Sequence, residues 1–80
     1  MELDQIYKDL NLIFRRELDN NDIILAQETT AKDVEGWDSL SYIQLIVAIE
    51  KHFKIRFTSS EIPSFNNIGE LANAVKNKIG

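Results

Sequence analysis

Apolar side chains recur at helical spacing from residue 40 to residue 53, and this run is the feature that most constrains the fold. Intervals of three and four residues place such side chains along a helix. A polar loop that ends in glycine and tryptophan precedes the run, and Asp38 and Ser39 stand where the helix must begin. Asp38 is a suitable N-cap with Ser39 as the first helical residue, although the reverse assignment fits nearly as well. We therefore predict a helix from Ser39 to Phe53.

This predicted helix has two apolar rows, whereas packing against one core needs only a single broad stripe. The row expected to face the core contains Leu45, Ile46, Ile49 and Phe53, with Tyr42 beside it. The second row lies beside Ser39 and Glu50 on a neighbouring face and contains Leu40, Ile43 and Val47. Two interpretations of the second row remain open: a wide buried face, or a docking surface for a partner next to the serine.

Two further helices are predicted from the same spacing, one on each side of this run. The first extends from Leu3 to Leu18, and its apolar stripe contains Ile6, Leu10, Ile13, Phe14 and Leu18. The last begins after Asn67, which can cap it while Glu70 returns the hydrogen bond, and it extends to about Lys78. Its inward face is expected to contain Ile68, Leu71, Val75 and Ile79.

The segments between the helices are predicted to be irregular. A long loop from Asp19 to Trp37 is expected to be anchored on the core by Ile23, Ile24 and Leu25, with a helical turn capped by Thr30. Residues 54–57 predict an extended connector whose Ile55 and Phe57 enter the core. A short third helix is then expected, capped by Thr58 with Glu61 and stopped by Pro63.

The predicted fold is all-α: a small four-helix bundle with three main helices, a short third helix and a long first loop. Eighty residues predict one domain, residues 1–80, and the absence of cysteine excludes disulfides and thiolate sites. A net charge of −4 argues against binding to nucleic acid. The first ten residues contain acids and no long apolar core, so neither a signal peptide nor a membrane span is predicted, and a cytoplasmic location is expected.

The hydroxyl of Ser39, at the start of the predicted helix, is the one group that the sequence pattern marks as open to chemical modification. Serine is common at helix starts for capping alone, so this position does not by itself indicate function. His52 is the only histidine, and it lies roughly 20 Å along the helix from Ser39, which excludes a serine hydrolase within one chain. No metal site is predicted, since the acidic residues lack the spacing of a calcium loop and no zinc signature is present. Trp37 is expected to be a packing anchor.

Asp38, Ser39 and Leu40, followed by an apolar helix that ends in residues 48–53 (AIEKHF), resemble the acyl carrier proteins. The resemblance covers nearly the whole chain and follows the order of helices and loops in that family. It implies that Ser39 carries a 4′-phosphopantetheine arm, transferred from coenzyme A by a separate Mg²⁺-dependent phosphopantetheinyl transferase. The thiol of the arm would hold an acyl group as a thioester, and the protein itself would catalyse nothing. Asp38 would be the acid that precedes the serine.

The resemblance also implies a partner face and a set of partners. The partner-facing positions would be Leu40, Ile43, Val47, Glu50 and Glu61. Besides the transferase, the partners would be acyl-loading ligases or synthases of fatty-acid, polyketide or specialised lipid or secondary-metabolite pathways, and the carrier is expected to be a monomer. Aminoacyl or peptidyl carriers, and a small helical interaction module that never receives the arm, remain as alternatives.

Two departures from the family pattern concern charge. Many fatty-acid carriers have acids two and five residues after the serine, where this chain has Ser41 and Gln44. Lys51, Lys54 and Arg56 make the end of the predicted helix more basic. Because charge complementarity determines the choice of partner and the rate of encounter, these departures argue against service to the general fatty-acid synthase. Residues 36–40 (GWDSL) look more like those of stand-alone carriers of specialised pathways, such as polyketide, modified-lipid or aminoacyl transfer systems.

Overall fold

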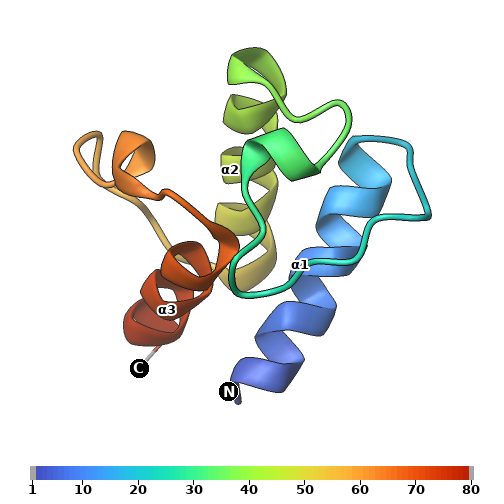
Figure 1. Ribbon diagram of the computed structural model, residues 1–80. Coiled ribbons are helices and arrows are strands. Elements are labelled where there is room, and N and C mark those ends of the chain that lie inside the picture. Colours follow the sequence, from blue (N-terminus) through green and yellow to red (C-terminus); the bar gives the residue numbers. More distant parts are fainter. Residues whose placement is uncertain (1, 80) are drawn as a thin grey trace.

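The computed structural model describes residues 2–79, which form three α-helices and two short 3₁₀ turns (Figure 1). The helices are α1 (Leu3–Glu17), α2 (Ser39–Phe53) and α3 (Ile68–Ile79), and the turns are η1 (Ala31–Asp33) and η2 (Ile62–Ser64). The predicted bounds of the central helix are confirmed. Helix α1 packs against both α2 and α3. The Ser39 end of α2 lies at the end of the molecule opposite the first turn of α1 and the last turn of α3 (Figure 1).

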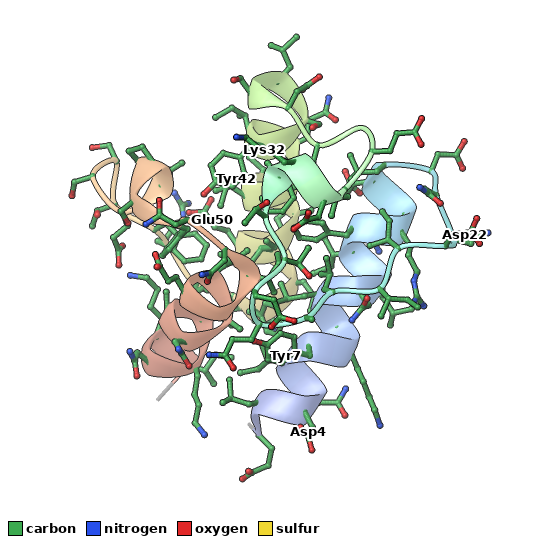
Figure 2. All side chains as sticks on the ribbon, in the orientation of Figure 1. Asp4, Tyr7, Asp22, Lys32, Tyr42 and Glu50 are labelled. Atoms are coloured by element: carbon green, nitrogen blue, oxygen red, sulfur yellow. The ribbon has the colours of Figure 1, made fainter. Side chains whose placement is uncertain are left out.

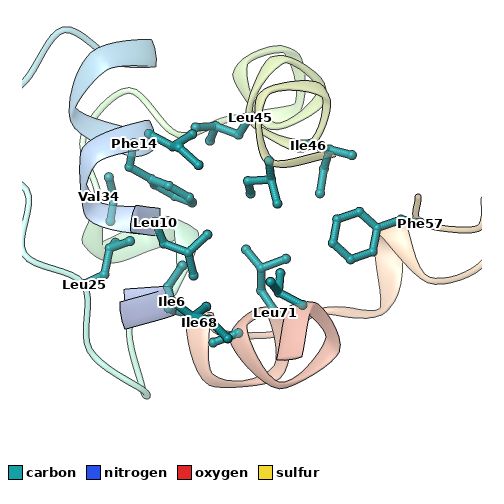
Figure 3. Close-up of a cluster of buried hydrophobic side chains, with 14 of the residues drawn as sticks. Ile6, Leu10, Phe14, Leu25, Val34, Leu45, Ile46, Phe57, Ile68 and Leu71 are labelled. Atoms are coloured by element: carbon teal, nitrogen blue, oxygen red, sulfur yellow. The ribbon is translucent and has the colours of Figure 1, made fainter. Parts of the chain in front are cut away.

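The core lies between the three helices and is made of the apolar stripes predicted for them (Figure 3). Its fully buried side chains are Ile6, Leu10, Ile13, Phe14, Leu45, Ile49, Ile68, Leu71 and Val75. Four predicted core residues lie further out: Leu18, Tyr42 and Phe53 are only half-buried, and Ile79 is exposed because it occupies the last turn of α3. The pattern therefore located the core, and it overestimated burial at the ends of the stripes.

Side chains of α1 hold the first half of the long loop against the helix. The Nε of Arg15 donates to the carbonyl oxygen of Ile23 (2.7 Å), and the amide of Leu25 donates to Oδ1 of Asn11 (2.9 Å). Ile23 and Leu25 are buried as predicted, but Ile24 is 79% exposed, so its assignment as an anchor was wrong. The physical reason is that successive side chains of an extended segment point to opposite sides.

The second half of the loop crosses the beginning of α3 at close range. The amide of Ile68 donates to the carbonyl oxygen of Thr29 (2.9 Å), and the amide of Gly69 donates to that of Gln27 (2.8 Å). These bonds give partners to amides of the first helical turn, which have none inside the helix. A Cβ at residue 69 would lie 2.6 Å from Cγ of Gln27 and 3.0 Å from its carbonyl oxygen. The close approach of loop and helix therefore requires glycine at this position.

The segment between α2 and α3 differs from the prediction. Ile55 and Phe57 enter the core as expected, and the predicted hydrogen bonds between Thr58 and Glu61 are present. The short third helix was misplaced, because the helical turn is η2, and Pro63 lies near its start and does not stop it. Proline suits the first positions of a helical turn, since its φ is already helical and its missing N–H would have no partner there.

We expect Gly69→Val to destabilise the fold by roughly 1–3 kcal/mol, the range typical of overpacking, because the new side chain meets the backbone of the loop. Urea denaturation measures the loss. The control is Asn73→Val, which places the same side chain on an exposed position of α3. Equal stabilities of the two variants would contradict the close packing of the loop on the helix.

Candidate functional site

A reciprocal pair of hydrogen bonds begins α2 at the predicted N-cap. The Oδ1 of Asp38 accepts from the amides of Leu40 (3.0 Å) and Ser41 (2.9 Å). In return, Oγ of Ser41 accepts from the amide of Asp38 (2.8 Å). The arrangement is a capping box, which satisfies amides at both sides of the helix start. Ser39, the first residue of the helix, is therefore held on a fixed turn.

Ser41 also ties this cap to the loop before it, a role that sequence reasoning missed. Its hydroxyl donates to the carbonyl oxygen of Gly36 (2.7 Å), which has a φ of +90°. This φ lies in a region that favours glycine. The three-residue spacing from Asp38 to Ser41 is the signal that was available, because it matches that of a capping box.

The hydroxyl of Ser39 takes no part in this network. Ser39 is exposed, and no side-chain hydrogen bond found within residues 2–79 uses its Oγ. The sole histidine is near the far end of α2, where Nε2 of His52 lies 3.1 Å from Oδ2 of Asp9. Over the same residues, no three histidine, aspartate or glutamate side chains gather as a metal site would require. Ser39 is thus accessible to an external enzyme, and within residues 2–79 no histidine is near enough to activate it.

The electrostatics of the cap determine where an anion on Ser39 would lie. Hydrogen bonds, first that from the amide of Ser41 and then that from Leu40, hold the pKa of Asp38 below its ordinary value. Asp38 is therefore ionised at neutral pH and already occupies two amides of the helix start. A phosphodiester on Ser39 would find these two amides occupied and would be repelled by the ionised carboxylate. The expected position of such a group is outward, in solvent.

An aromatic hollow of about 280 Å³ opens beside Ser39, lined by Ala31, Trp37, Asp38, Ser39, Tyr42 and Phe65. Trp37 packs edge-on against Phe14 at a ring separation of 5.2 Å, so it is a packing anchor as predicted. Tyr42 extends from α2 toward the segment that contains η2, and its hydroxyl donates to the carbonyl oxygen of Ile62 (Figure 2). Burial raises the pKa of Tyr42, which keeps this hydroxyl protonated. The hollow is mainly apolar.

The second apolar row of α2 is exposed. Leu40 is 83%, Ile43 55% and Val47 43% accessible to solvent, so the interpretation of this row as part of a wide buried face is wrong. We call these three residues the apolar ridge. On a helix, residues three and four apart share one face, so the ridge forms a continuous strip that starts next to Ser39.

The two acids predicted to share the partner face both have partners within the fold. One carboxylate oxygen of Glu50 accepts from the amide of Phe57 (2.8 Å), and Figure 2 shows Glu50 extending toward that segment. Glu61 lies 2.8 Å from Nζ of Lys78 and accepts from the amide of Thr58. The ion pair with Lys78 and the bond from Thr58 lower the pKa of Glu61. The apolar ridge is thus the free part of the predicted face.

Comparison with known proteins identifies a family and a similar solved structure. The family model described as "Phosphopantetheine attachment site" matches residues 9–75. The solution NMR structure of a holo acyl carrier protein from Geobacter metallireducens has a TM-score of 0.86 and 42% sequence identity to this chain. That match covers 92% of this chain and 85% of the other.

We expect Asp38→Ala to lower the melting temperature at neutral pH by roughly 5 °C, because two amides lose their acceptor. The lowered pKa of Asp38 means that its ionised form stabilises the fold above the ordinary aspartate value of 3.8. That contribution is lost as the pH falls through the lowered pKa. The gap between wild type and variant should therefore narrow in acid, as measured by thermal unfolding followed by circular dichroism.

Asp38→Asn is the matched control for this experiment, because it keeps an acceptor oxygen and removes the charge. It should retain most of the stability that Asp38→Ala loses. A gap between wild type and Asp38→Ala that stays constant down to about pH 2 would contradict a role for the ionised carboxylate.

Proposed function

The chain belongs to the family of phosphopantetheine attachment domains, and from this we propose that it is an acyl carrier protein whose arm is attached to Ser39. The family match covers residues 9–75, and the prosthetic group of the family is covalently bound 4′-phosphopantetheine. The observation that carries the proposal is the position of Ser39. Its exposed hydroxyl stands free at the start of α2, beside an aromatic hollow.

The residues around Ser39 fit the prosthetic group. The phosphodiester needs an accessible hydroxyl and room in solvent, and both are present at the first residue of α2. The hollow of about 280 Å³ provides apolar walls for the arm or for the first carbons of its cargo. The cap of Asp38 and Ser41 fixes the turn, so the point of attachment stays in place while the arm moves.

Attachment of the arm requires chemistry that this chain does not supply. Ser39 Oγ would form the new bond to phosphorus as the pyrophosphate bond of coenzyme A breaks, and adenosine 3′,5′-bisphosphate would leave. The sole histidine, His52, is roughly 20 Å away along α2, and the neighbouring carboxylate of Asp38 is a weak base whose Oδ1 already accepts from two amides. A phosphopantetheinyl transferase would therefore accept the proton of the hydroxyl. When bound, the group supplies a thiol that holds an acyl chain as a thioester.

The partners of this carrier would dock on the apolar ridge. The ridge starts next to Ser39. The arm would therefore emerge at the border of the contact with any enzyme that covers Leu40, Ile43 and Val47. Apolar residues at helical spacing are a common basis for recognition in a groove. Besides the transferase, the partners are acyl-loading ligases or synthases, with Glu50 and Glu61 at the border of the same surface.

An acyl cargo fits this site better than an aminoacyl cargo. The hollow beside Ser39 is lined mainly by Trp37, Tyr42, Phe65 and Ala31, and these side chains favour an apolar chain over a charged amine. Beside the ridge, Ser41 and Gln44 stand where many fatty-acid carriers have acids, which favours a specialised lipid or polyketide pathway over general fatty-acid synthesis. We place the carrier in the cytoplasm, where its coenzyme A donor is available. No helix within residues 2–79 is long and apolar enough to cross a membrane.

Incubation with coenzyme A, Mg²⁺ and a broad-specificity phosphopantetheinyl transferase should add the mass of one phosphopantetheinyl group. Ser39→Ala should abolish the gain and keep the helical circular dichroism, because the hydroxyl of Ser39 takes part in no side-chain hydrogen bond within residues 2–79. The matched control is Ser41→Ala, which removes a hydroxyl two residues away. It should still be loaded, although it is less stable.

Loading of Ser39→Ala, or loss of loading in Ser41→Ala with the fold intact, would contradict the assignment. The absence of any gain in wild type, even with the transferase of the native host, would favour an unmodified interaction module.

Ile43→Asp and Val47→Asp should each slow loading by the transferase at least about tenfold and change the stability little, because both side chains are exposed. Loading rates from intact mass and urea denaturation measure the two effects. Leu12→Asp is the matched control, since Leu12 is exposed on α1, away from the ridge, and its variant should be loaded at the normal rate. Unfolding of Ile43→Asp, or equal slowing by Leu12→Asp, would argue against docking on the ridge.

A further inference from the structure

The apolar ridge of α2 continues into a row of cations. Lys51 lies four residues after Val47 and therefore on the same face of the helix. Lys54 ends the helix, Arg56 follows in the connector, and all three basic side chains are exposed. The surface that starts at Ser39 is thus apolar along its first half and basic along its second half.

Two hollows flank this surface and share two of its residues. The hollow between α1 and α2 has a volume of about 680 Å³ and is lined by Ile43, Val47, Lys51 and Arg16, among others. The one on the other side, about 570 Å³, is lined by Val47, Lys51, Lys54 and Arg56, together with Glu50 and Ile55. Because Val47 and Lys51 line both, the hollows lie on either side of one strip of α2. A partner that covers the strip has two places to insert side chains.

The positive charge of this strip is not neutralised by its neighbours. Glu50 lines one hollow, and its single negative charge stands against the three positive charges of Lys51, Lys54 and Arg56. Glu17 lines the other and lies 3.3 Å from Nε of Arg16. Lys51, Lys54 and Arg56 take part in no ion pair within the part of the chain that the structure describes. A chain with a net charge of −4 therefore has a locally positive surface here.

Acidic side chains are concentrated at the opposite end of α2. Glu35 and Asp38 precede Ser39, both are exposed, and the hydrogen bonds of the cap keep Asp38 ionised at neutral pH. Twelve residues of helix separate Ser39 from Lys51, a distance of roughly 18 Å along the axis. The docking surface is thus negative beside the attachment point and positive at its far end. Such a surface favours one orientation of a charged partner over the reverse.

We propose that the apolar ridge and the cations Lys51, Lys54 and Arg56 dock an enzyme whose apolar socket is bordered by carboxylates on the side away from its active-site entrance. The proposal rests on the carrier function proposed above and adds to it the charge of the partner. The carboxylates would lie roughly 18 Å from the entrance that receives the arm, which matches the distance from Ser39 to Lys51. When the carboxylates of the partner pair with these cations, the entrance to its active site lies over Ser39.

An anionic membrane is the other surface that an apolar and basic strip can bind. The charge pattern favours a protein, because Glu35 and Asp38 would be repelled by a uniformly negative surface. The hollows on both sides of the ridge also suit separate side chains better than a lipid surface.

The test uses the phosphopantetheine-loaded protein labelled with ¹⁵N and two helical peptides. Both peptides have the same leucine face, bordered by glutamates in one and by lysines in the other. Shifts of backbone amides on titration give the affinity and the site. The glutamate peptide should bind more tightly, weaken as salt is added, and shift amides of residues 40–56.

The variant for this test is Lys51→Glu/Arg56→Glu, and its control Lys8→Glu/Lys76→Glu has the same net charge. The first should weaken binding of the glutamate peptide roughly tenfold, since each rim pair adds a modest attraction that reversal turns into repulsion. The control should bind like wild type, because Lys8 and Lys76 are exposed on α1 and α3. Circular dichroism verifies that both variants are folded.

Equal binding of both peptides, or equal effects of both double variants, would overturn the proposal. It would also be overturned if phosphatidylglycerol vesicles bound through residues 40–56 and the glutamate peptide did not. Loading of Ser39, measured by mass in the same samples, reports separately on the carrier function. A protein that is loaded but does not distinguish the peptides loses only the docking proposal, whereas one that is never loaded loses the proposed function.

Discussion

The fixed start of α2 is the constraint on which the rest of this structure depends. The carboxylate of Asp38 holds two amides of the helix, and Ser41 returns the bond and ties the turn to Gly36. This network uses the residues on both sides of Ser39 and leaves the hydroxyl of Ser39 itself free. A chain that is to carry a group must present an accessible atom on a support that does not move, and the cap satisfies both requirements.

The remainder of the fold positions that turn. Helix α1 packs against α2 and α3 and holds the long loop through Asn11 and Arg15, so the loop has a defined path over the core. The loop then gives partners to the first amides of α3 and delivers Trp37 to the core edge, where it packs against Phe14. A loop that is long for a small domain is thus ordered by a few bonds to helices. Its route ends at the attachment point.

The sequence was sufficient where periodicity and capping act locally. Residues Ser39–Phe53, the cap at Asp38 and the buried face of α1 follow directly from spacing. It failed where the outcome depends on tertiary contacts. Alternation along an extended segment accounts for the exposure of Ile24, but the sequence did not show that this segment is extended. The path of the loop past Gly69 requires a close approach of distant segments. The pairing of His52 with Asp9 likewise joins residues that are far apart in the chain. The exposure of the apolar ridge also needed the structure, since its spacing fits either a core or a docking surface.

Peptide mapping by tandem mass spectrometry of the wild-type protein, after loading from coenzyme A, tests the central claim most directly. The account predicts one phosphopantetheinyl group, located on Ser39, because this hydroxyl is exposed and free of the network around it. A group found instead on Ser41, Ser59, Ser60 or Ser64, or spread over several serines, would contradict it. In that case the fixed turn at the start of α2 would not be the site that the transferase recognises.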